Sequence, residues 1–343
     1  MTKKVNMDDI AKKLNISKNT VSLALRNMPG ISSQTSKLIF DAAKELGYEY
    51  KKSLKTSSAK ETDSKNICLI LSKSIRNMIG FYSYIQMGIE EEAKRNSLNT
   101  ILYYYDENDE NFETPLCIRD GIVSGIITLG HVTRNNLNKI IGYKIPLVAI
   151  DEYYDNLNLD YVLTDNLCGG YVATEYLIKH GHRKIGFAGD IHQASSFYDR
   201  YYGFLKAMSD HSLHVNSPYT LIDKGLQKFL NKDIAPVVNE LKSLPELPTA
   251  FFCCNDPEAL ALYKAFNIMG LRVPDDVSII GFDNIDSAKN VSPELTTMHV
   301  EKELTGIKAV RRLVEKMQDK TGVSQKILIP TTLVERQSVI VCD

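Results

Sequence analysis

The chain has 343 residues, of which 43% are hydrophobic and 24% charged, and its net charge is −1. This composition is typical of globular proteins with two or three domains. It contains no apolar run near the ~20 residues of a membrane span, and the basic amino terminus lacks the apolar core of a signal peptide. We therefore expect a cytoplasmic protein. The six cysteines form no CxxC pair, which favours buried free thiols.

The charge is unevenly distributed. Residues 1–60 carry 12 Lys and Arg against 5 Asp and Glu, a net +7, and the rest of the chain carries a net −8. A small basic head on a mildly acidic body indicates a polyanionic partner at the head. A solvated basic face would give the same count, so charge alone does not distinguish a bound polyanion from an exposed surface.

Residues 1–49 predict three short helices. Asn6 is suited to cap the first helix, and Asn15 tolerates the left-handed backbone that ends it. Ser17 would cap the second helix, and Ser32 would begin the third. Two short helices joined by a tight turn and braced by a third form a helix-turn-helix unit. The apolar residues expected on the core side of the second and third helices are Val21, Ala24, Leu25, Leu38, Ile39, Ala42, Ala43 and Leu46.

The second predicted helix presents Lys18 and Asn19 in its first turn. These donor-bearing side chains can meet base edges in the major groove. A three-helix bundle with merely solvated polar groups is the alternative, but it does not explain why short polar donors gather at two neighbouring helix starts. We therefore predict that the head binds double-stranded DNA. The hydroxyl and amide groups expected to contact phosphates belong to Ser17, Thr20, Asn27, Ser32, Ser33 and Thr35.

The stretch "VNMDDIAKKLNISKNTVSLALRNMPGISSQT" resembles the DNA-binding head of the LacI/GalR family of bacterial transcription regulators, and the resemblance covers residues 5–48. It implies that Lys18, Asn19 and Ser22 face the operator, and Asn6 joins the expected DNA-binding set. The family usually has an arginine where this chain has Leu23, which would instead touch a thymine methyl group.

The segment after the third helix also departs from the family. The family has a proline and a minor-groove leucine where this chain has Tyr50 and Ser57. A straighter DNA site read only through the major groove therefore stays open as an alternative. Residues 50–65 are rich in Lys, Ser and Thr without apolar periodicity, which predicts a linker or an atypical hinge.

Beyond the linker, eight short apolar runs alternate with segments long enough for crossover helices. This alternation predicts parallel sheets covered on both faces and divided between two α/β lobes. The strands are expected at 66–72, 99–105, 124–130, 145–151, 183–190, 219–223, 249–254 and 277–283, and the helices at 82–95, 166–180, 197–210, 232–243, 256–270 and 301–317.

The body resembles the two-lobed, periplasmic-binding-protein-like effector domain of the same family through "TDNLCGGYVATEYLIKHGHRKIGFAGD", "DRYYGF" and "CCNDPEALALYKAFNIMGLRVPDDVSIIGFDN". The resemblance implies an effector-binding and dimerisation domain over 66–343. We expect lobe 1 at about 66–162 plus 292–325, and lobe 2 at about 163–291 plus 326–343. The overall fold class is then a three-helix head followed by a two-lobed α/β domain.

A ligand of such lobes sits off the carboxyl ends of the strands. The polar residues there that match effector-holding positions of the family are Asp151, Arg200, Asn255 and Asp283, and the matching aromatic pair is Phe81 and Tyr82. Carboxylates, a guanidinium and an amide beside an aromatic face suit a sugar. A hexose, a disaccharide or a nucleoside would each fit.

Each of these residues has an ordinary structural alternative. The two aspartates would cap turns, and Arg200 would pair with Asp199 or Asp283. Asn255 would cap the helix at 256–270. The three tyrosines around Arg200 would line the pocket or belong to the core, and they are Tyr198, Tyr201 and Tyr202.

The sequence contains no P-loop, dinucleotide fingerprint or GxSxG elbow, and His180 and His182 lie in a polar turn with no third metal ligand. We therefore expect no enzymatic activity, metal or cofactor. The prediction is a ligand-controlled transcription regulator, a repressor, that binds a palindromic operator as a homodimer. The rivals are a transporter-associated solute-binding protein, which the head disfavours, and a sugar-modifying enzyme, which lacks a catalytic constellation.

Overall fold

The structure is a computed structural model, and the chain divides into two compact units, residues 1–61 and 62–343. Of the predicted linker at 50–65, only Lys65 belongs to the described part. The structure describes every residue except 1–4, 26–31, 49–64, 74, 76–79, 107–111, 216–218, 222–224, 230, 320–321 and 343.

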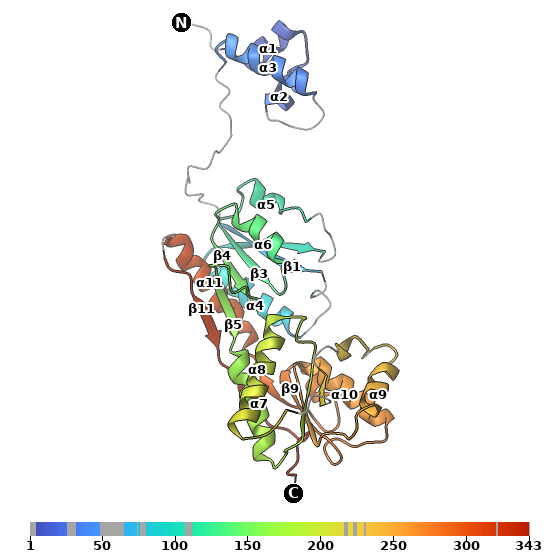
Figure 1. Cartoon of the computed structure of the whole chain (residues 1–343). Coiled ribbons are helices and arrows are strands. Elements are labelled where there is room, and N and C mark those ends of the chain that lie inside the picture. Colours follow the sequence, from blue (N-terminus) through green and yellow to red (C-terminus); the bar gives the residue numbers. More distant parts are fainter. Residues whose placement is uncertain are drawn as a thin grey trace. The chain divides into compact units, whose positions relative to one another are not determined.

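The head contains the three predicted helices (Figure 1). The side chain of Asn6 accepts the backbone N–H groups of Asp8 and Asp9, and the Asp9 carboxylate accepts the N–H of Asn6, which completes a capping box. Asn15 ends the first helix with a φ of 50°, as predicted. The helices are α1 (Met7–Leu14), α2 (Lys18–Leu25) and α3 (Ser33–Glu45).

The core of the head follows the predicted helical spacing with one exception. Ile10, Val21 and Ile39 are fully buried, and their neighbours at helical spacing are also inside. Leu38, expected on the core side, is 57% exposed. Positions 39, 42, 43 and 46 already form the inward stripe of α3, and residue 38 lies about 100° away from Ile39 around the helix axis.

The body contains two six-stranded sheets, each of which forms one lobe. All described neighbours in the sheet of lobe 1 are parallel. This pattern agrees with the predicted continuous apolar runs, because parallel strands are covered on both faces. In spatial order the strands are β11 (Lys326–Ile329), β5 (Asp160–Thr164), β4 (Leu147–Ile150), β3 (Gly125–Leu129), β1 (Asn66–Ser72) and β2 (Asn99–Tyr105).

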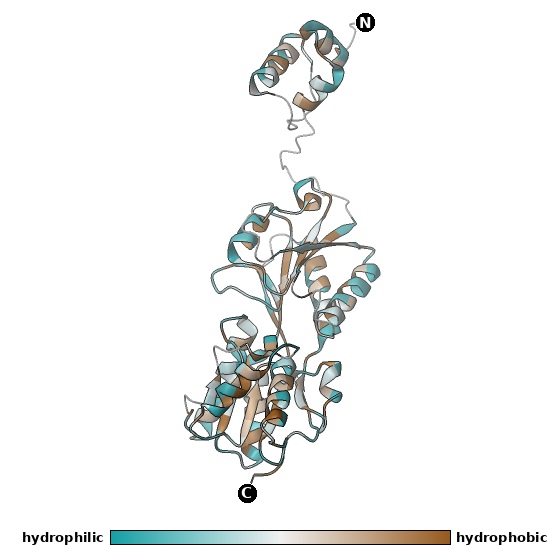
Figure 2. Ribbon diagram, turned by 90° about the vertical axis from the view of Figure 1, so that its right-hand side faces the viewer, coloured by the Kyte–Doolittle hydropathy of each residue, from teal (hydrophilic) through white to brown (hydrophobic). Residues whose placement is uncertain are grey.

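The sheet of lobe 2 is parallel apart from its last edge strand, which runs antiparallel to its neighbour. Figure 2 shows the hydrophobic strands enclosed by helices with hydrophilic outer faces. In spatial order the strands are β12 (Thr332–Val334), β10 (Thr296–His299), β9 (Ser278–Asp283), β8 (Ala250–Cys253), β6 (Ile185–Ala188) and β7 (Thr220–Leu221).

The helices cover these sheets in two sets. Those of lobe 1 are α4 (Tyr82–Arg95), α5 (Leu116–Arg119), α6 (Arg134–Ile141) and α11 (Lys302–Gln318). Those of lobe 2 are α7 (Asn166–Lys179), α8 (Ser195–Asp210), α9 (Ala235–Lys242) and α10 (Asp256–Ile268), with the 3₁₀ turns η3 (Leu226–Phe229) and η4 (Asp286–Lys289).

The lobe boundaries predicted at 292 and 326 are wrong. Strand β10 pairs in parallel with β9 in lobe 2, although 292–325 was assigned to lobe 1. Strand β11 pairs with β5 in lobe 1, although 326–343 was assigned to lobe 2. The physical reason is that only the short η4 turn separates β9 from the next strand, which therefore joins the same sheet. The crossing to lobe 1 comes later, with α11.

Glycines bring two pairs of helices into backbone contact. A Cβ at Gly170 of α7 would lie 2.3 Å from the carbonyl oxygen of Arg200 in α8. A Cβ at Gly203 of α8 would lie 2.3 Å from the carbonyl oxygen of Leu167 in α7. In lobe 1, a Cβ at Gly306 of α11 would lie 2.2 Å from the carbonyl oxygen of Ile85 in α4. Only glycine fits at these helix crossings.

Candidate functional site

The exposed surface of the head centres on the first turn of α2. Lys18 and Asn19 are both exposed there, and the Lys18 Nζ forms an ion pair of 2.7 Å with Asp8. The Ser17 Oγ accepts the backbone N–H of Thr20 at 3.0 Å, so it caps α2 as predicted. The two donors predicted to read bases and a capped helix start therefore lie side by side.

The start of α3 has the same arrangement. The Ser32 Oγ accepts the backbone N–H of Thr35 at 3.1 Å, and the two hydroxyl oxygens are 2.7 Å apart. In α2, Ser22 and Leu23 are partly buried. Asn27, from the predicted phosphate-contacting set, lies outside the described residues. Ser17 and Ser32 thus cap the starts of α2 and α3, and their hydroxyls stay at the surface.

In the body, Asp151 lies directly after β4 with a φ of 71°. The Tyr82 hydroxyl, from the first residue of α4, donates to the Asp151 Oδ2 at 2.7 Å. Burial raises the pKa of both groups, and the hydrogen bond from Tyr82 and the nearby Arg200 oppose the rise for Asp151. Lobe 1 therefore presents a paired tyrosine and aspartate at the carboxyl end of its sheet.

Lobe 2 presents Arg200 from α8, which is only 2% exposed. Its Nε donates to the Asn166 side-chain oxygen at 2.9 Å, and its Nη1 donates to the Cys254 carbonyl oxygen at 2.6 Å. The guanidinium lies 3.8 Å from the centre of the Phe282 ring. Three neighbours on different elements therefore fix the orientation of this cation.

Arg200 also pairs with Asp283, the second of its two predicted partners. Its Nη2 is 3.2 Å from the Asp283 Oδ1. Burial raises the pKa of Asp283 to about 6, against the lowering effect of Arg200 and Lys302. Asp199 instead accepts the hydroxyl of Tyr153 at 3.0 Å.

The residues of the two lobes meet in one electrostatic neighbourhood. Asp283 and Arg200 of lobe 2 both affect the pKa of Tyr82 in lobe 1. Phe81 packs against the hydrophobic cores of both lobes. The structure thus brings together five of the six predicted ligand residues, which come from four separate regions of the sequence.

Asn255, the sixth predicted ligand residue, caps a helix, which was its structural alternative in the sequence. Its Oδ1 accepts the backbone N–H of Glu258 at 2.8 Å and caps α10. The next residue, Asp256, is the one whose charge reaches Asp283. Spacing alone did not single out Asp256 or Lys302, whose Nζ donates to the carbonyl oxygens of Asp283 and Asn284. Asp256 adjoins Asn255 in the quoted "CCNDPEAL", so the motif itself contained the signal.

Comparison with known proteins identifies both units. The model of the bacterial regulatory proteins of the lacI family matches residues 6–50, and that of a periplasmic binding protein-like domain matches 174–339. The HTH-type transcriptional repressor PurR of Pasteurella multocida is 33% identical over 335 residues, covering 96% of this chain and 97% of the relative. PurR of Actinobacillus pleuropneumoniae serotype 3 is 34% identical, with coverages of 96% and 97%. The chain belongs to the LacI family.

Solved structures of transcriptional regulators share the fold. The CelR–cellobiose complex has a TM-score of 0.70 at 21% identity and covers 97% of this chain and 99% of that one. A regulator from Bacillus cereus subsp. cytotoxis has a TM-score of 0.71 at 25% identity, with coverages of 82% and 100%. A LacI-family regulator from Enterococcus faecium with bound ribose has a TM-score of 0.69 at 24% identity, with coverages of 81% and 100%.

These relatives confirm the predicted fold class and the predicted family. The chain is a DNA-binding transcription repressor of the LacI family with a periplasmic-binding-protein-like domain for a small effector. The curated relatives are repressors rather than enzymes, as predicted. Among the described residues, no helix is long and apolar enough to cross a membrane.

The predicted aromatic pocket around Arg200 has a different arrangement. Tyr201 packs against Phe187 and Phe204 in the core of lobe 2. Tyr198 and Tyr202 are exposed, with ring centres 4.6 Å apart and a hydrogen bond between their hydroxyls. None of the three is among the contacts of Arg200 described above, because residues one or two positions away from Arg200 point in other directions from α8.

His180 and His182 both form hydrogen bonds within the protein. The His182 ring bonds the Thr249 hydroxyl at 2.9 Å and the Ile340 carbonyl oxygen at 3.1 Å. The His180 ring bonds the Tyr176 carbonyl oxygen at 2.8 Å. In the part of the chain that the structure describes, no group of three His, Cys, Asp or Glu could hold a metal ion.

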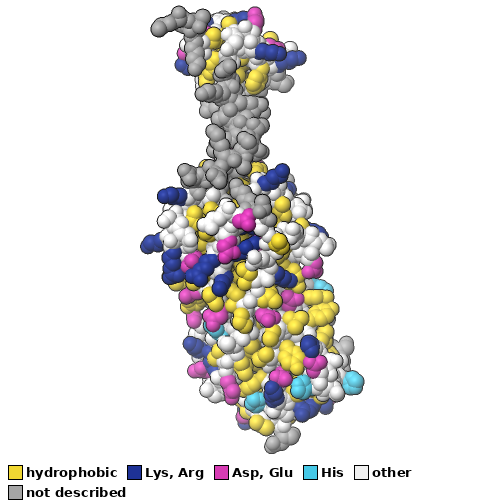
Figure 3. Space-filling view, turned by 90° about the vertical axis from the view of Figure 1, so that its left-hand side faces the viewer, with side chains coloured by type: hydrophobic (Ala, Val, Ile, Leu, Met, Phe, Trp, Pro, Cys, Tyr) yellow, Lys and Arg dark blue, Asp and Glu magenta, His cyan; other side chains and the backbone are white. Residues whose placement is uncertain are grey.

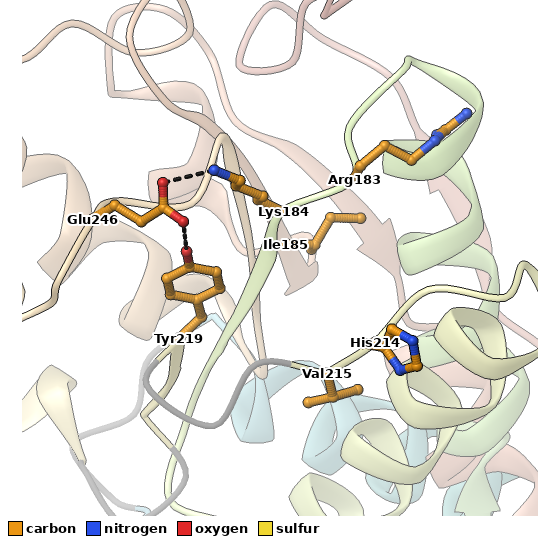
Figure 4. A pocket seen from close by; sticks show the side chains of 7 residues that line it. All are labelled: Arg183, Lys184, Ile185, His214, Val215, Tyr219 and Glu246. Carbon is orange, nitrogen blue, oxygen red and sulfur yellow. Dashed lines mark hydrogen bonds and ion pairs between the residues drawn. The ribbon is translucent and has the colours of Figure 1, made fainter.

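A hollow of about 330 Å³ lies elsewhere in lobe 2 (Figure 4). Glu246 there accepts the Lys184 ammonium at 2.6 Å and the Tyr219 hydroxyl at 2.5 Å. The lining residues precede or begin β6, β7 and β8, so the hollow is at the amino ends of these strands. The ligand residues described above lie at the opposite edge of the sheet.

Proposed function

We propose that the repressor binds a carbohydrate between its two lobes and that this ligand controls its affinity for DNA. The observation that carries the proposal is the convergence of Tyr82 and Asp151 from lobe 1 with Arg200 and Asp283 from lobe 2. A ligand that bridges the two pairs would favour one arrangement of the lobes, which is the requirement for allosteric control.

The chemistry of these groups suits a polyhydroxylated ring. Two carboxylates accept hydrogen bonds from hydroxyls, the guanidinium donates in a fork, and Phe81 offers an apolar face. A nucleoside combines a sugar with a second ring and is the competing ligand class. Ribose and cellobiose, which are bound in two of the structural relatives, are the first two compounds to test.

For the head, we propose that α2 enters the major groove with Lys18, Asn19 and Ser22 towards the bases. The hydroxyls at the two helix starts would contact phosphates. A palindromic operator would be bound by a homodimer in the cytoplasm, with two heads on half-sites about one helical turn apart.

The homodimer needs an apolar surface on the body. Met87 on α4 and Ile268 on α10 are 48% and 55% exposed, and we propose these two helices as the contact strips. Figure 3 shows hydrophobic side chains gathered on one face of the lower lobe, between charged groups. Large exposed apolar areas of this kind favour association.

The ligand proposal is tested by thermal-shift screening of the full chain with ribose, cellobiose, other sugars and nucleosides. The screen is repeated on Arg200→Ala and on a matched variant, Arg183→Ala. Arg183 is in the same lobe, donates to the Ile178 carbonyl oxygen and lines the hollow at the far edge of the sheet.

A sugar that stabilises the parent and Arg183→Ala but not Arg200→Ala is the expected result. A compound that stabilises all three alike would place its site outside the cleft. A response to nucleosides alone would keep the cleft but replace the proposed ligand class.

A further inference from the structure

The turn that follows β9 has an unfavourable backbone. Asp283 and Asn284 adopt φ values of 105° and 50° in succession, and neither is a glycine. L-residues rarely take such values, and they persist only where the surroundings fix the chain. Because Asp283 is the carboxylate paired with Arg200, whatever fixes this turn also places a proposed ligand group.

Asp256 forms a hydrogen bond to the end of this turn. It is the first residue of α10 and is fully buried. Its Oδ2 accepts the backbone N–H of Ile285 at 2.8 Å, and its Oδ1 accepts the hydroxyl of Thr297 in β10 at 2.5 Å. The Asp256 carboxylate therefore connects α10 and β10 to Ile285, the residue that follows the two unfavourable φ values.

The sheet leaves room for this carboxylate at a single glycine. A Cβ at Gly281 of β9 would lie 2.3 Å from the Asp256 Oδ1. Gly281 is two residues before Asp283 on the same strand, so the two carboxylates lie close to one another. Burial and the charge of Asp283 raise the pKa of Asp256 to about 7.

Other groups brace the turn from different directions. The Arg336 Nη2 donates to the Asn284 Oδ1 at 2.7 Å, and the Lys302 Nζ donates to the Asn284 carbonyl oxygen at 3.2 Å. These contacts hold Asn284, whereas Asp256 holds the N–H of Ile285. The charged groups around Asp256 are Asp283 on β9 and Lys302 on α11, with Glu258 on its own helix.

We infer that Asp256 is a positioning residue of the effector site: its buried carboxylate holds the turn after β9 so that Asp283 faces Arg200. The inference rests on the proposed function, in which Asp283 contacts the ligand. It gives a role to Asp256, a residue that the sequence analysis did not single out. Asp256 itself acts through Asp283 and does not touch the ligand.

The first test measures hydrogen exchange of the Ile285 amide in the full chain, by mass spectrometry with fragmentation to single residues. Asp256→Ala removes the acceptor, so exchange should become about tenfold faster, as for the loss of one hydrogen bond. Asp256→Asn retains a side-chain oxygen for this N–H, and the Thr297 hydroxyl can reverse to accept from the amide. Exchange in this variant should stay within about threefold of the parent.

The matched control is Asp276→Ala. Asp276 also accepts a backbone N–H, that of Arg272 at 2.8 Å, but in an exposed turn of the same lobe. Its loss should leave the Ile285 amide unchanged. Should Asp256→Ala fail to fold, Thr297→Val replaces it, because it removes the hydroxyl bond that orients the carboxylate, together with a longer bond of 3.4 Å from the Asn284 N–H. An Ile285 amide that exchanges at the parental rate in the folded variant would overturn the inference.

The second test measures the thermal shift with the compound selected in the screen above. Asp256→Ala should lose at least about half of the ligand-induced shift, whereas Asp256→Asn and Asp276→Ala should keep it. A full shift in Asp256→Ala would overturn the positioning role and leave the proposed function standing. If no sugar or nucleoside binds, the proposed ligand class fails, and the exchange experiment alone still decides whether Asp256 holds the turn.

Discussion

At the scale of single residues, Asp151 follows β4 and Asp283 ends β9, and they are close enough for the charge of Asp151 to raise the pKa of Asp283. Strand ends in α/β sheets carry ligands, which is why the sequence predicted these two residues as neighbours. The cap formed by Asn255 and the buried contact of Asp256 depend on side-chain directions that no spacing rule supplies.

The DNA contact of α2 can be tested at two residues. Asn19→Ala and Lys18→Ala should each lower affinity for a DNA site selected from a random pool by about 5- to 150-fold, the equivalent of about 1–3 kcal/mol per base contact. Lys13→Ala is the control, because Lys13 also forms an exposed ion pair in the head, with Glu45, but lies on α1. Fluorescence anisotropy measures the affinities. Equal losses in Lys18→Ala and Lys13→Ala, with none in Asn19→Ala, would reduce the contact to non-specific charge.

The buried aspartates predict a pH dependence of stability. The pKa of Asp256 is raised to about 7 and that of Asp283 to about 6, so the folded state binds these protons more tightly than the unfolded state. The contribution of these two residues to the free energy of unfolding is therefore greatest below the unfolded pKa of about 4. It is lost as pH rises towards 7. Asp256→Asn should reduce the decline of the urea midpoint between pH 5.5 and 8.

The control for this prediction is Asp276→Asn. The pKa of Asp276 is lowered, mainly by its hydrogen bond from the Arg272 backbone, so its contribution is constant above pH 5.5. The parental slope should persist in this variant. A slope that is as steep in Asp256→Asn as in the parent would show that Asp256 does not titrate in this range.

At the scale of elements, apolar runs predict the central strands well. The strands at 66–72 and 99–105 have the predicted bounds, as does the helix at 82–95. Strand β5 was missed because it begins with Asp160, a charge that the folded chain buries by pairing it with Arg312 and Lys316. Pairing of this kind depends on α11, which lies far away in the sequence.

The helix crossings give a prediction about stability. In a free helix, Gly→Ala is favourable by about 1 kcal/mol. At Gly170 and Gly306, however, the added Cβ would meet a backbone oxygen at 2.3 and 2.2 Å. Each substitution should therefore lower the free energy of unfolding by about 1–3 kcal/mol, as overpacking does. Urea denaturation measures this.

Gly225 supplies the matched control, because a Cβ there would meet nothing within 4 Å. Gly225→Ala should leave the urea midpoint close to that of the parent. If Gly170→Ala were as stable as Gly225→Ala, the backbones of α7 and α8 would not be in contact.

At the scale of the whole molecule, two bonds between tyrosine and aspartate join the lobes around the cleft. The Tyr84 hydroxyl donates to Asp286 at 3.1 Å, and the Tyr153 hydroxyl donates to Asp199 at 3.0 Å. Arg200 and Asp283 are only 2% and 7% exposed, so the proposed ligand would reach them when the lobes part. The sequence could not predict these contacts, because each joins segments more than 40 residues apart.

The tyrosine contacts predict how readily the lobes separate. The double variant Tyr84→Phe and Tyr153→Phe loses two hydrogen bonds of about 1 kcal/mol each, which favours open forms by roughly tenfold or more. The radius of gyration of the full chain in X-ray scattering should increase. Tyr154→Phe loses a bond within lobe 1, to the Val132 carbonyl oxygen, and should not change it. Equal radii in all variants would mean that these bonds do not restrain the lobes.

The most direct test of ligand-controlled repression measures DNA binding by the full chain with and without a saturating amount of the sugar that the thermal screen selects. We predict a change in affinity for the selected DNA site of about 5- to 150-fold, the usual range of allosteric coupling. The change should be absent in Arg200→Ala, which should bind DNA like the unliganded parent. An affinity that is the same with and without the bound sugar would contradict the account, because the cleft would then not control the head.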